Sequence, residues 1–213
     1  MNHHVNMSFR ASYATMNEIH PGTKHIWIAC HGYGQLANHF IKRFDVFDPE
    51  RHFILAPEGL ARFYLNGHKK VGASWMTKHD RETDLENQQS YFDALFRQVF
   101  GQTDLKEYQL HLLGFSQGVS MISRLAAYKR LNFDHLILWA GGFPPELCNE
   151  DFTFLKKSAK LKIVLGSSDQ FFQMPAFQTD IDKAASATGL EAELMHFDGG
   201  HELDREVLSG IVD

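Results

Sequence analysis

The fold of this chain is decided by the stretch Leu110-His111-Leu112-Leu113-Gly114-Phe115-Ser116-Gln117-Gly118. It begins as an apolar run of strand length and ends in a Gly-x-Ser-x-Gly pattern, where helical spacing of apolar residues starts. A serine on a sharp turn between a strand and a helix has strained backbone angles, and flanking glycines let the strand and the helix approach closely. The stretch therefore predicts a nucleophile elbow with Ser116 exposed above a sheet. The alternative interpretation is a Gly-Ser turn before a helix that carries no chemistry.

Other apolar runs of strand length recur along the chain, separated by turn residues and by segments with helical spacing. The expected strands are His25–Cys30, His52–Ala56, Gln109–Phe115, His135–Ala140, Leu161–Gly166 and Glu191–Phe197. Asp84–Phe100 and Gln117–Leu131 carry apolar residues three and four positions apart, as amphipathic helices do. This alternation predicts one α/β domain over residues 1–213, with a mostly parallel central sheet and helices on both of its faces. Met7–Met16 fits an added antiparallel edge strand.

Composition and charge exclude several classes of protein. The chain has 213 residues, 44% of them hydrophobic, which is enough for a sizeable core. A formal net charge of −5 gives no basic surface for nucleic acid. Cys30 and Cys148 have neither disulfide-framework nor zinc-site spacing, and no window approaches the ~18 apolar residues of a membrane span. We therefore expect a cytoplasmic protein without a nucleic-acid partner, and the oligomeric state stays open.

A serine hydroxyl needs a base, and the chain has 13 histidines. In strand–turn–helix hydrolases the serine comes first, then the acid, then the histidine, which leaves His135, His196 and His201. The first two fall in expected strands. His201 follows two glycines after the last strand, so it is the predicted base.

The predicted acid is Asp169, which follows an expected strand and lies between the serine and the histidine in the chain. Asp180 and Asp182 fall in an expected helix, and Asp198 is too near His201 in sequence to approach the far side of its ring. The alternative role for Asp169 is a turn aspartate that accepts hydrogen bonds from neighbouring backbone N–H groups.

The oxyanion of an acyl-transfer intermediate needs preorganised N–H donors. The residue after the nucleophile, Gln117, supplies the first. The loop His31-Gly32-Tyr33-Gly34-Gln35 follows the first apolar strand and supplies the second, which we assign to the Tyr33 N–H. We expect His31 to brace this loop.

Together these residues resemble the phospholipase/carboxylesterase family of serine esterases, which includes acyl-protein thioesterases. The resemblance spans His25 to about His201 and rests on His31-Gly32-Tyr33-Gly34, Pro57, Gly114-Phe115-Ser116-Gln117-Gly118, Gly142-Phe143-Pro144, Asp169 and Gly200-His201. It implies an α/β-hydrolase fold without a large lid domain and without a cofactor. It also implies hydrolysis of carboxylic esters or thioesters of small to medium acyl groups.

The chain departs from the family pattern around the substrate. Gln35 stands where an acidic residue is usual, and Phe171-Phe172 replaces a valine-proline pair after the acid. Trp75 matches the tryptophan of the substrate loop, but Met76 and Thr77 follow it in place of an aromatic and an acidic residue. These changes leave the predicted triad intact and indicate a different substrate.

Aromatic residues are expected to line an acyl pocket at the carboxyl edge of the sheet, where ligands bind in open α/β folds. The residues Gly59–Asp80 have no clear period, so we expect a long binding loop that brings Trp75 to this edge. Phe143, Phe171 and Phe172 converge there as well. The alternative for each ring is ordinary core packing.

Two other functions compete with the esterase. Gly32 to Ala37 also fits the G-x-G-x-x-A dinucleotide pattern, with Glu58 as the ribose-binding acid of a nicotinamide-dependent oxidoreductase. A catalytically silent ligand-binding protein could keep the pocket. A metal site is not predicted, because His201-Glu202-Leu203-Asp204-Arg205 lacks the second histidine of H-E-x-x-H.

Overall fold

The computed structural model describes residues 3–212, which form a seven-stranded sheet in the order β1-β3-β2-β6-β7-β8-β9. β1 pairs antiparallel with β3, and all other neighbours in this sheet are parallel. The strands are β1 (Tyr13–Met16), β2 (His25–Cys30), β3 (His52–Pro57), β6 (Gln109–Phe115), β7 (His135–Trp139), β8 (Lys160–Gly166) and β9 (Ala192–Phe197). The six expected strands and the mostly parallel sheet are confirmed. The antiparallel edge strand is present, but shorter than Met7–Met16.

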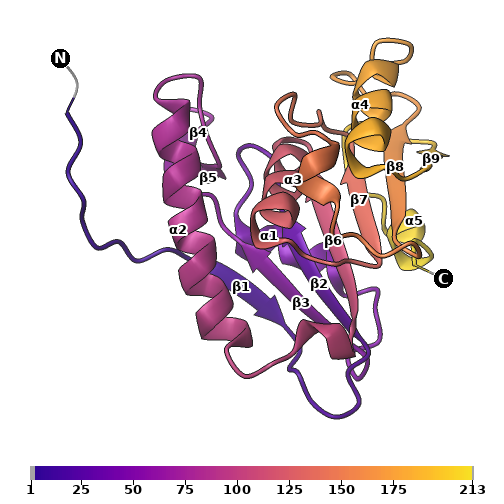
Figure 1. Cartoon of the computed structure of the whole chain (residues 1–213). Helices are drawn as coiled ribbons and strands as arrows, with labels where there is room; N and C mark the ends of the chain where they lie inside the picture. Colours follow the sequence, from indigo (N-terminus) through magenta and orange to yellow (C-terminus); the bar gives the residue numbers. More distant parts are fainter. Residues whose placement is uncertain (1–2, 213) are drawn as a thin grey trace.

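Helices cover both faces of this sheet, as predicted. The two long helices α2 (Arg81–Phe100) and α3 (Gln117–Lys129) lie over one face, and α1 (Ala37–Phe40) lies behind the sheet in Figure 1. The remaining helical segments are η1 (Ile41–Phe44), η2 (Leu105–Glu107), η3 (Asn149–Phe152), α4 (Gln178–Thr188) and α5 (Arg205–Ser209). Because helices cover both faces, β2, β3 and β7 are apolar and buried along nearly their whole length.

The expected loop Gly59–Asp80 is instead mostly a β-hairpin. β4 (Ala61–Leu65) pairs antiparallel with β5 (Lys70–Ser74). Asn66 and Gly67 begin the turn, with φ of 49° and 62°. An Asn-Gly pair between two short strands is a strong hairpin signal. The turn could therefore be predicted from the sequence, although the strands lack a clear alternation of apolar and polar residues.

No large lid domain covers the described residues. Within residues 3–212, no helix combines the length and the apolar character that crossing a membrane requires. The assignment of residues 1–213 to a single domain stays a prediction, and residues 1, 2 and 213 lie outside the described part.

Four histidines are linked at the end of the sheet where the parallel strands begin. His111 Nδ1 lies 3.1 Å from His135 Nδ1, and His111 Nε2 lies 3.0 Å from His25 Nδ1. The His25 ring stacks on His52, with ring centroids 4.2 Å apart. Burial, helped by the neighbouring histidines, lowers the pKa of His111 from 6.5 to about 2, and burial lowers the pKa of His135 to about 4. These two rings are therefore neutral in the folded protein at pH 7.

The histidine row predicts a loss of stability in acid. A histidine whose pKa is lower in the folded than in the unfolded chain takes up a proton on unfolding when the pH lies between the two values. The stability that its neutral form contributes is therefore fully present above about pH 6.5 and is lost as the pH falls toward 4. Each such ring costs about 1.4 kcal/mol per pH unit in this window. Denaturant titrations at several pH values should give a shallower slope for His111→Gln than for the wild type. The exposed control His79→Gln should keep the wild-type slope, and equal slopes for all three proteins would contradict this account.

Candidate active site

Ser116 occupies a strained turn between the last residue of β6 and the first residue of α3. Its φ of 54° and ψ of −120° lie outside the regions that residues other than glycine commonly adopt. Its N–H donates to the Trp139 carbonyl oxygen at 2.8 Å. A Cβ atom on Gly114 would lie 2.5 Å from the Gly118 carbonyl oxygen, and one on Gly118 would collide with the Cys30 carbonyl. Both positions of the Gly-x-Ser-x-Gly pattern therefore require glycine.

Ser116, His201 and Asp169 are brought together at the carboxyl edge of the sheet, from three separate loops. His201 Nε2 lies 2.9 Å from Ser116 Oγ, and His201 Nδ1 lies 2.7 Å from Asp169 Oδ2. The Asp169 side chain is buried, and its Oδ1 accepts hydrogen bonds from the Phe171 and Phe172 N–H groups at 2.8 and 3.0 Å. Asp169 thus bonds to its own turn, as the alternative interpretation expected, and also to the histidine.

This arrangement determines which ring nitrogen carries the proton. An ionised Asp169 can only accept, so the neutral His201 ring donates from Nδ1. Its Nε2 then presents a lone pair to the Ser116 hydroxyl. A base oriented by a carboxylate and bonded to a serine can activate that serine as a nucleophile.

Three phenylalanine rings surround the His201 ring. The ring centroids of Phe115, Phe171 and Phe172 lie 5.0, 4.8 and 5.9 Å from that of His201. Phe172 also packs on Phe177 and is only partly exposed, whereas the Phe171 side chain is 66% exposed beside the histidine. Phe171 is therefore the ring of this group that an incoming substrate can contact most readily.

The two expected oxyanion donors have unused N–H groups. Within residues 3–212, neither the Tyr33 nor the Gln117 backbone N–H donates to a protein acceptor. The loop around Tyr33 is fixed from both sides: the Gly32 N–H donates to Gln35 Oε1 at 2.8 Å, and the Gly34 N–H donates to the Ala73 carbonyl of β5 at 2.9 Å. The hairpin that the sequence analysis missed thus holds the loop in place.

His31 has the bracing geometry that the sequence predicted. Its Nε2 accepts a hydrogen bond from the Gly59 N–H at 3.0 Å, and its Nδ1 lies 2.8 Å from the Gly32 carbonyl oxygen. Burial lowers the pKa of His31, although the Gly32 carbonyl and the Glu58 carboxylate act in the opposite direction. A neutral His31 can accept with one nitrogen while it donates with the other, so both contacts are satisfied.

The Gln117 side chain contributes a contact that sequence reasoning missed. Its Oε1 accepts from the Trp75 N–H at 3.1 Å, and its Nε2 donates to the Met76 carbonyl at 2.9 Å. The residue after Ser116 therefore ties the elbow to the end of the hairpin. The sequence offered one signal for this contact, because the side-chain amide of a glutamine can donate and accept hydrogen bonds at the same time.

Glu58 does not have the geometry of a ribose-binding acid. Its Oε2 accepts from the Ala37 N–H at 3.1 Å, and its Oε1 accepts from Arg62 Nε at 2.9 Å. The Glu58 side chain is buried by these contacts. Both carboxylate oxygens of Glu58 already accept hydrogen bonds from the protein, so this residue does not supply the ribose-binding acid that the dinucleotide pattern around Gly32 requires.

Comparison with known proteins identifies the fold. No protein-family model and no curated protein sequence matches the chain. Among solved structures, esterase PE8 is 20% identical with a TM-score of 0.67, and the match covers 96% of this chain and 98% of that one. Acyl-protein thioesterase 2 of Zea mays is 13% identical with a TM-score of 0.69 over 95% and 96% of the two chains. The Bacillus cereus carboxylesterase is 13% identical with a TM-score of 0.69 over 94% and 91%.

The chain has the α/β-hydrolase fold. This confirms the predicted fold class, and the resemblance seen in the sequence is matched by structures of esterases and thioesterases.

Two of the four rings expected to line the acyl pocket lie in the core of the protein. Trp75 is 1% exposed, and its ring N–H donates to the His31 carbonyl at 2.8 Å. Phe143 is 4% exposed and packs against Phe152. The hairpin directs Trp75 inward beneath the loop of His31. Because both rings are buried, core packing is the correct interpretation for Trp75 and Phe143.

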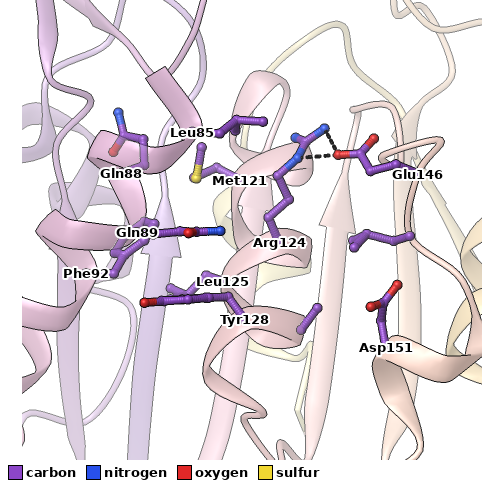
Figure 2. A pocket seen from close by; sticks show the side chains of 12 residues that line it. Leu85, Gln88, Gln89, Phe92, Met121, Arg124, Leu125, Tyr128, Glu146 and Asp151 are labelled. Carbon is purple, nitrogen blue, oxygen red and sulfur yellow. Dashed lines mark hydrogen bonds and ion pairs between the residues drawn. The ribbon is translucent and has the colours of Figure 1, made fainter. Parts of the chain in front are cut away.

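Two cavities lie near the elements that carry the site. A groove of about 700 Å³ borders His201, Phe115 and Gly34. A smaller cavity of about 290 Å³ lies between α2 and α3, where Arg124 Nε donates to Glu146 Oε1 at 2.7 Å (Figure 2). None of the predicted site residues lines the smaller cavity. His201, one of the predicted site residues, lines the groove.

The different burial of two aromatic rings predicts different effects on stability. Trp75→Ala removes a buried ring and its hydrogen bond, so the free energy of unfolding should fall by about 3–5 kcal/mol. Phe171→Ala removes an exposed ring and should change it by less than about 0.5 kcal/mol. Denaturant unfolding of both variants measures the difference. A Trp75→Ala variant as stable as the wild type would contradict the burial of this ring.

Proposed function

We propose that this α/β-hydrolase is a serine esterase, a divergent member of the phospholipase/carboxylesterase family that cleaves carboxylic esters or thioesters through an acyl-enzyme intermediate. The observation that carries the proposal is the continuous line of contacts from Asp169 to His201 at 2.7 Å and from His201 to Ser116 at 2.9 Å. The similarity of the fold to solved esterases and a thioesterase supports it.

In the first half of the proposed reaction, Ser116 Oγ attacks the carbonyl carbon while its proton moves to His201 Nε2. The carbonyl oxygen gains the negative charge and accepts hydrogen bonds from the Tyr33 and Gln117 N–H groups. Asp169 stabilises the imidazolium that has formed. When the intermediate collapses, His201 gives its proton to the leaving alcohol or thiol, and the acyl group stays on Ser116.

In the second half, a water molecule takes the place of the leaving group. The water oxygen attacks the acyl carbon while His201 removes a proton from the water. His201 then returns a proton to Ser116 Oγ. The products are a carboxylic acid and the free enzyme. No cofactor is required, because the three side chains and the two N–H groups supply every proton transfer and charge contact.

We propose short-to-medium acyl groups as substrates. The exposed Phe171 ring and the partly exposed Phe172 ring offer apolar contact beside His201, and a groove of about 700 Å³ has the size of a small-ligand site. A graded panel of 4-nitrophenyl esters and acyl thioesters tests this range and separates the two leaving groups.

The proposed nucleophile is tested by covalent labelling. A fluorophosphonate should add once to the wild-type chain, at Ser116, because the hydroxyl is activated by His201. Intact-protein and peptide mass spectrometry give the number and the place of adducts. Ser116→Ala should take up no label, and Asp169→Asn should lower kcat/KM at least about 100-fold, since the imidazole loses its orienting carboxylate.

The exposed serine variant Ser158→Ala is the matched control and should label like the wild type. Labelling of Ser116→Ala at the wild-type rate would refute the assignment. A folded wild-type protein that neither labels nor hydrolyses any ester of the panel would favour a silent binding protein.

A further inference from the structure

The groove beside His201 gathers positive charge in a protein whose formal net charge is −5. Arg43, Lys69 and Lys70 line it, and the carboxylate among its lining residues is that of Glu202. The cations come from two separate parts of the chain, since Arg43 belongs to η1 while the lysines belong to the β4–β5 hairpin. The local excess of cations is opposite in sign to the charge of the whole chain.

Within residues 3–212, these three cations form no ion pair. Among the described residues, no carboxylate lies within 4.0 Å of the charged nitrogens of Arg43, Lys69 or Lys70. Some cations elsewhere in the described residues are paired with carboxylates; Arg62, for example, lies 2.7 Å from Glu58. The groove therefore presents positive charge that an incoming anion can meet without first displacing a carboxylate.

The groove also offers apolar surface next to this charge. Leu36, Leu65, Val71 and Leu203 line it together with the cations. A cleft lined by charges of one sign focuses their field and raises the local concentration of ligands of the opposite sign. A ligand that fits the groove combines a short carbon chain with a negatively charged group.

We propose that this groove binds an anionic group of the ester, so that the substrate class is esters with a carboxylate or similar anion on the acyl or the alcohol part. This inference rests on the proposed hydrolysis at Ser116, because His201 and Phe115 border the same groove. The apolar side chains of the groove contact the carbon chain, and the cations select its charged end.

Two substrate pairs measure the charge preference. The acyl pair is the mono-4-nitrophenyl ester of adipic acid and its methyl-capped neutral counterpart. The alcohol pair is 4-acetoxybenzoate and its methyl ester. For each pair, the ratio of kcat/KM for the anionic over the neutral ester is compared between proteins, so that the intrinsic reactivity of the esters cancels.

In the triple variant Arg43→Gln/Lys69→Gln/Lys70→Gln, the ratio should fall about 10-fold for the pair whose charge reaches the groove. Raising the ionic strength from about 0.01 M to about 1 M should lower the wild-type ratio toward that of the variant, because the Debye length shrinks from about 30 Å to about 3 Å. The double variant Lys69→Arg/Lys70→Arg keeps the charge and should keep the wild-type ratio. Lys106→Gln, an exposed lysine outside the groove, should also keep it.

Failure of this inference and failure of the proposed function give different results. If the neutral esters are hydrolysed and Ser116 labels normally, but both ratios are the same in the wild type and the triple variant, the anion site is refuted and the esterase stands. If the wild type hydrolyses none of the four esters and Ser116 takes up no phosphonate, both are refuted. Phosphonate labelling of the triple variant at the wild-type rate shows that its fold and nucleophile are intact.

Discussion

The close approach of backbone segments around Ser116 is the constraint on which the rest of the site depends. Gly118 packs against the Cys30 carbonyl, and Gly141 packs against the carbonyl of Ser116 itself, each so closely that a Cβ atom would collide. The sheet stabilises the strained serine through the hydrogen bond from its N–H to the Trp139 carbonyl at 2.8 Å. With the backbone fixed in this way, the hydroxyl lies within hydrogen-bond distance of His201.

The β4–β5 hairpin extends this close packing to the loop of His31–Gln35, which we propose holds the oxyanion. The Gly34 N–H donates to the Ala73 carbonyl, and Gly72 lies so close to Gly34 that a side chain would not fit between them. Trp75 follows the hairpin and binds the His31 carbonyl through its ring and Gln117 through its backbone. A single short hairpin thus connects the loop, the elbow and the core, and it also carries the lysines of the proposed anion groove.

The parallel strands and the elbow could be predicted from the sequence because they depend on local patterns, namely apolar runs and the glycines around Ser116. The pairing of Asp169 with His201 could be predicted from chain order and from positions after strands. The inward orientation of Trp75 could not, because it depends on how the hairpin before it folds back on the loop of His31, which is distant in sequence. The cationic groove was missed for a similar reason: Arg43 and Lys69 are separated in sequence and are brought together by tertiary structure.

The proposed reactivity of Ser116 depends on the backbone packing that holds its hydroxyl beside His201, and the rate of fluorophosphonate labelling of Gly118→Ala tests this dependence most directly. Gly210→Ala is the matched control, because a Cβ atom there would meet open space. We expect folded Gly118→Ala to label at least about 100-fold more slowly than the wild type, as displaced catalytic groups do, while Gly210→Ala keeps the wild-type rate. A folded Gly118→Ala that labels at the wild-type rate would contradict the account.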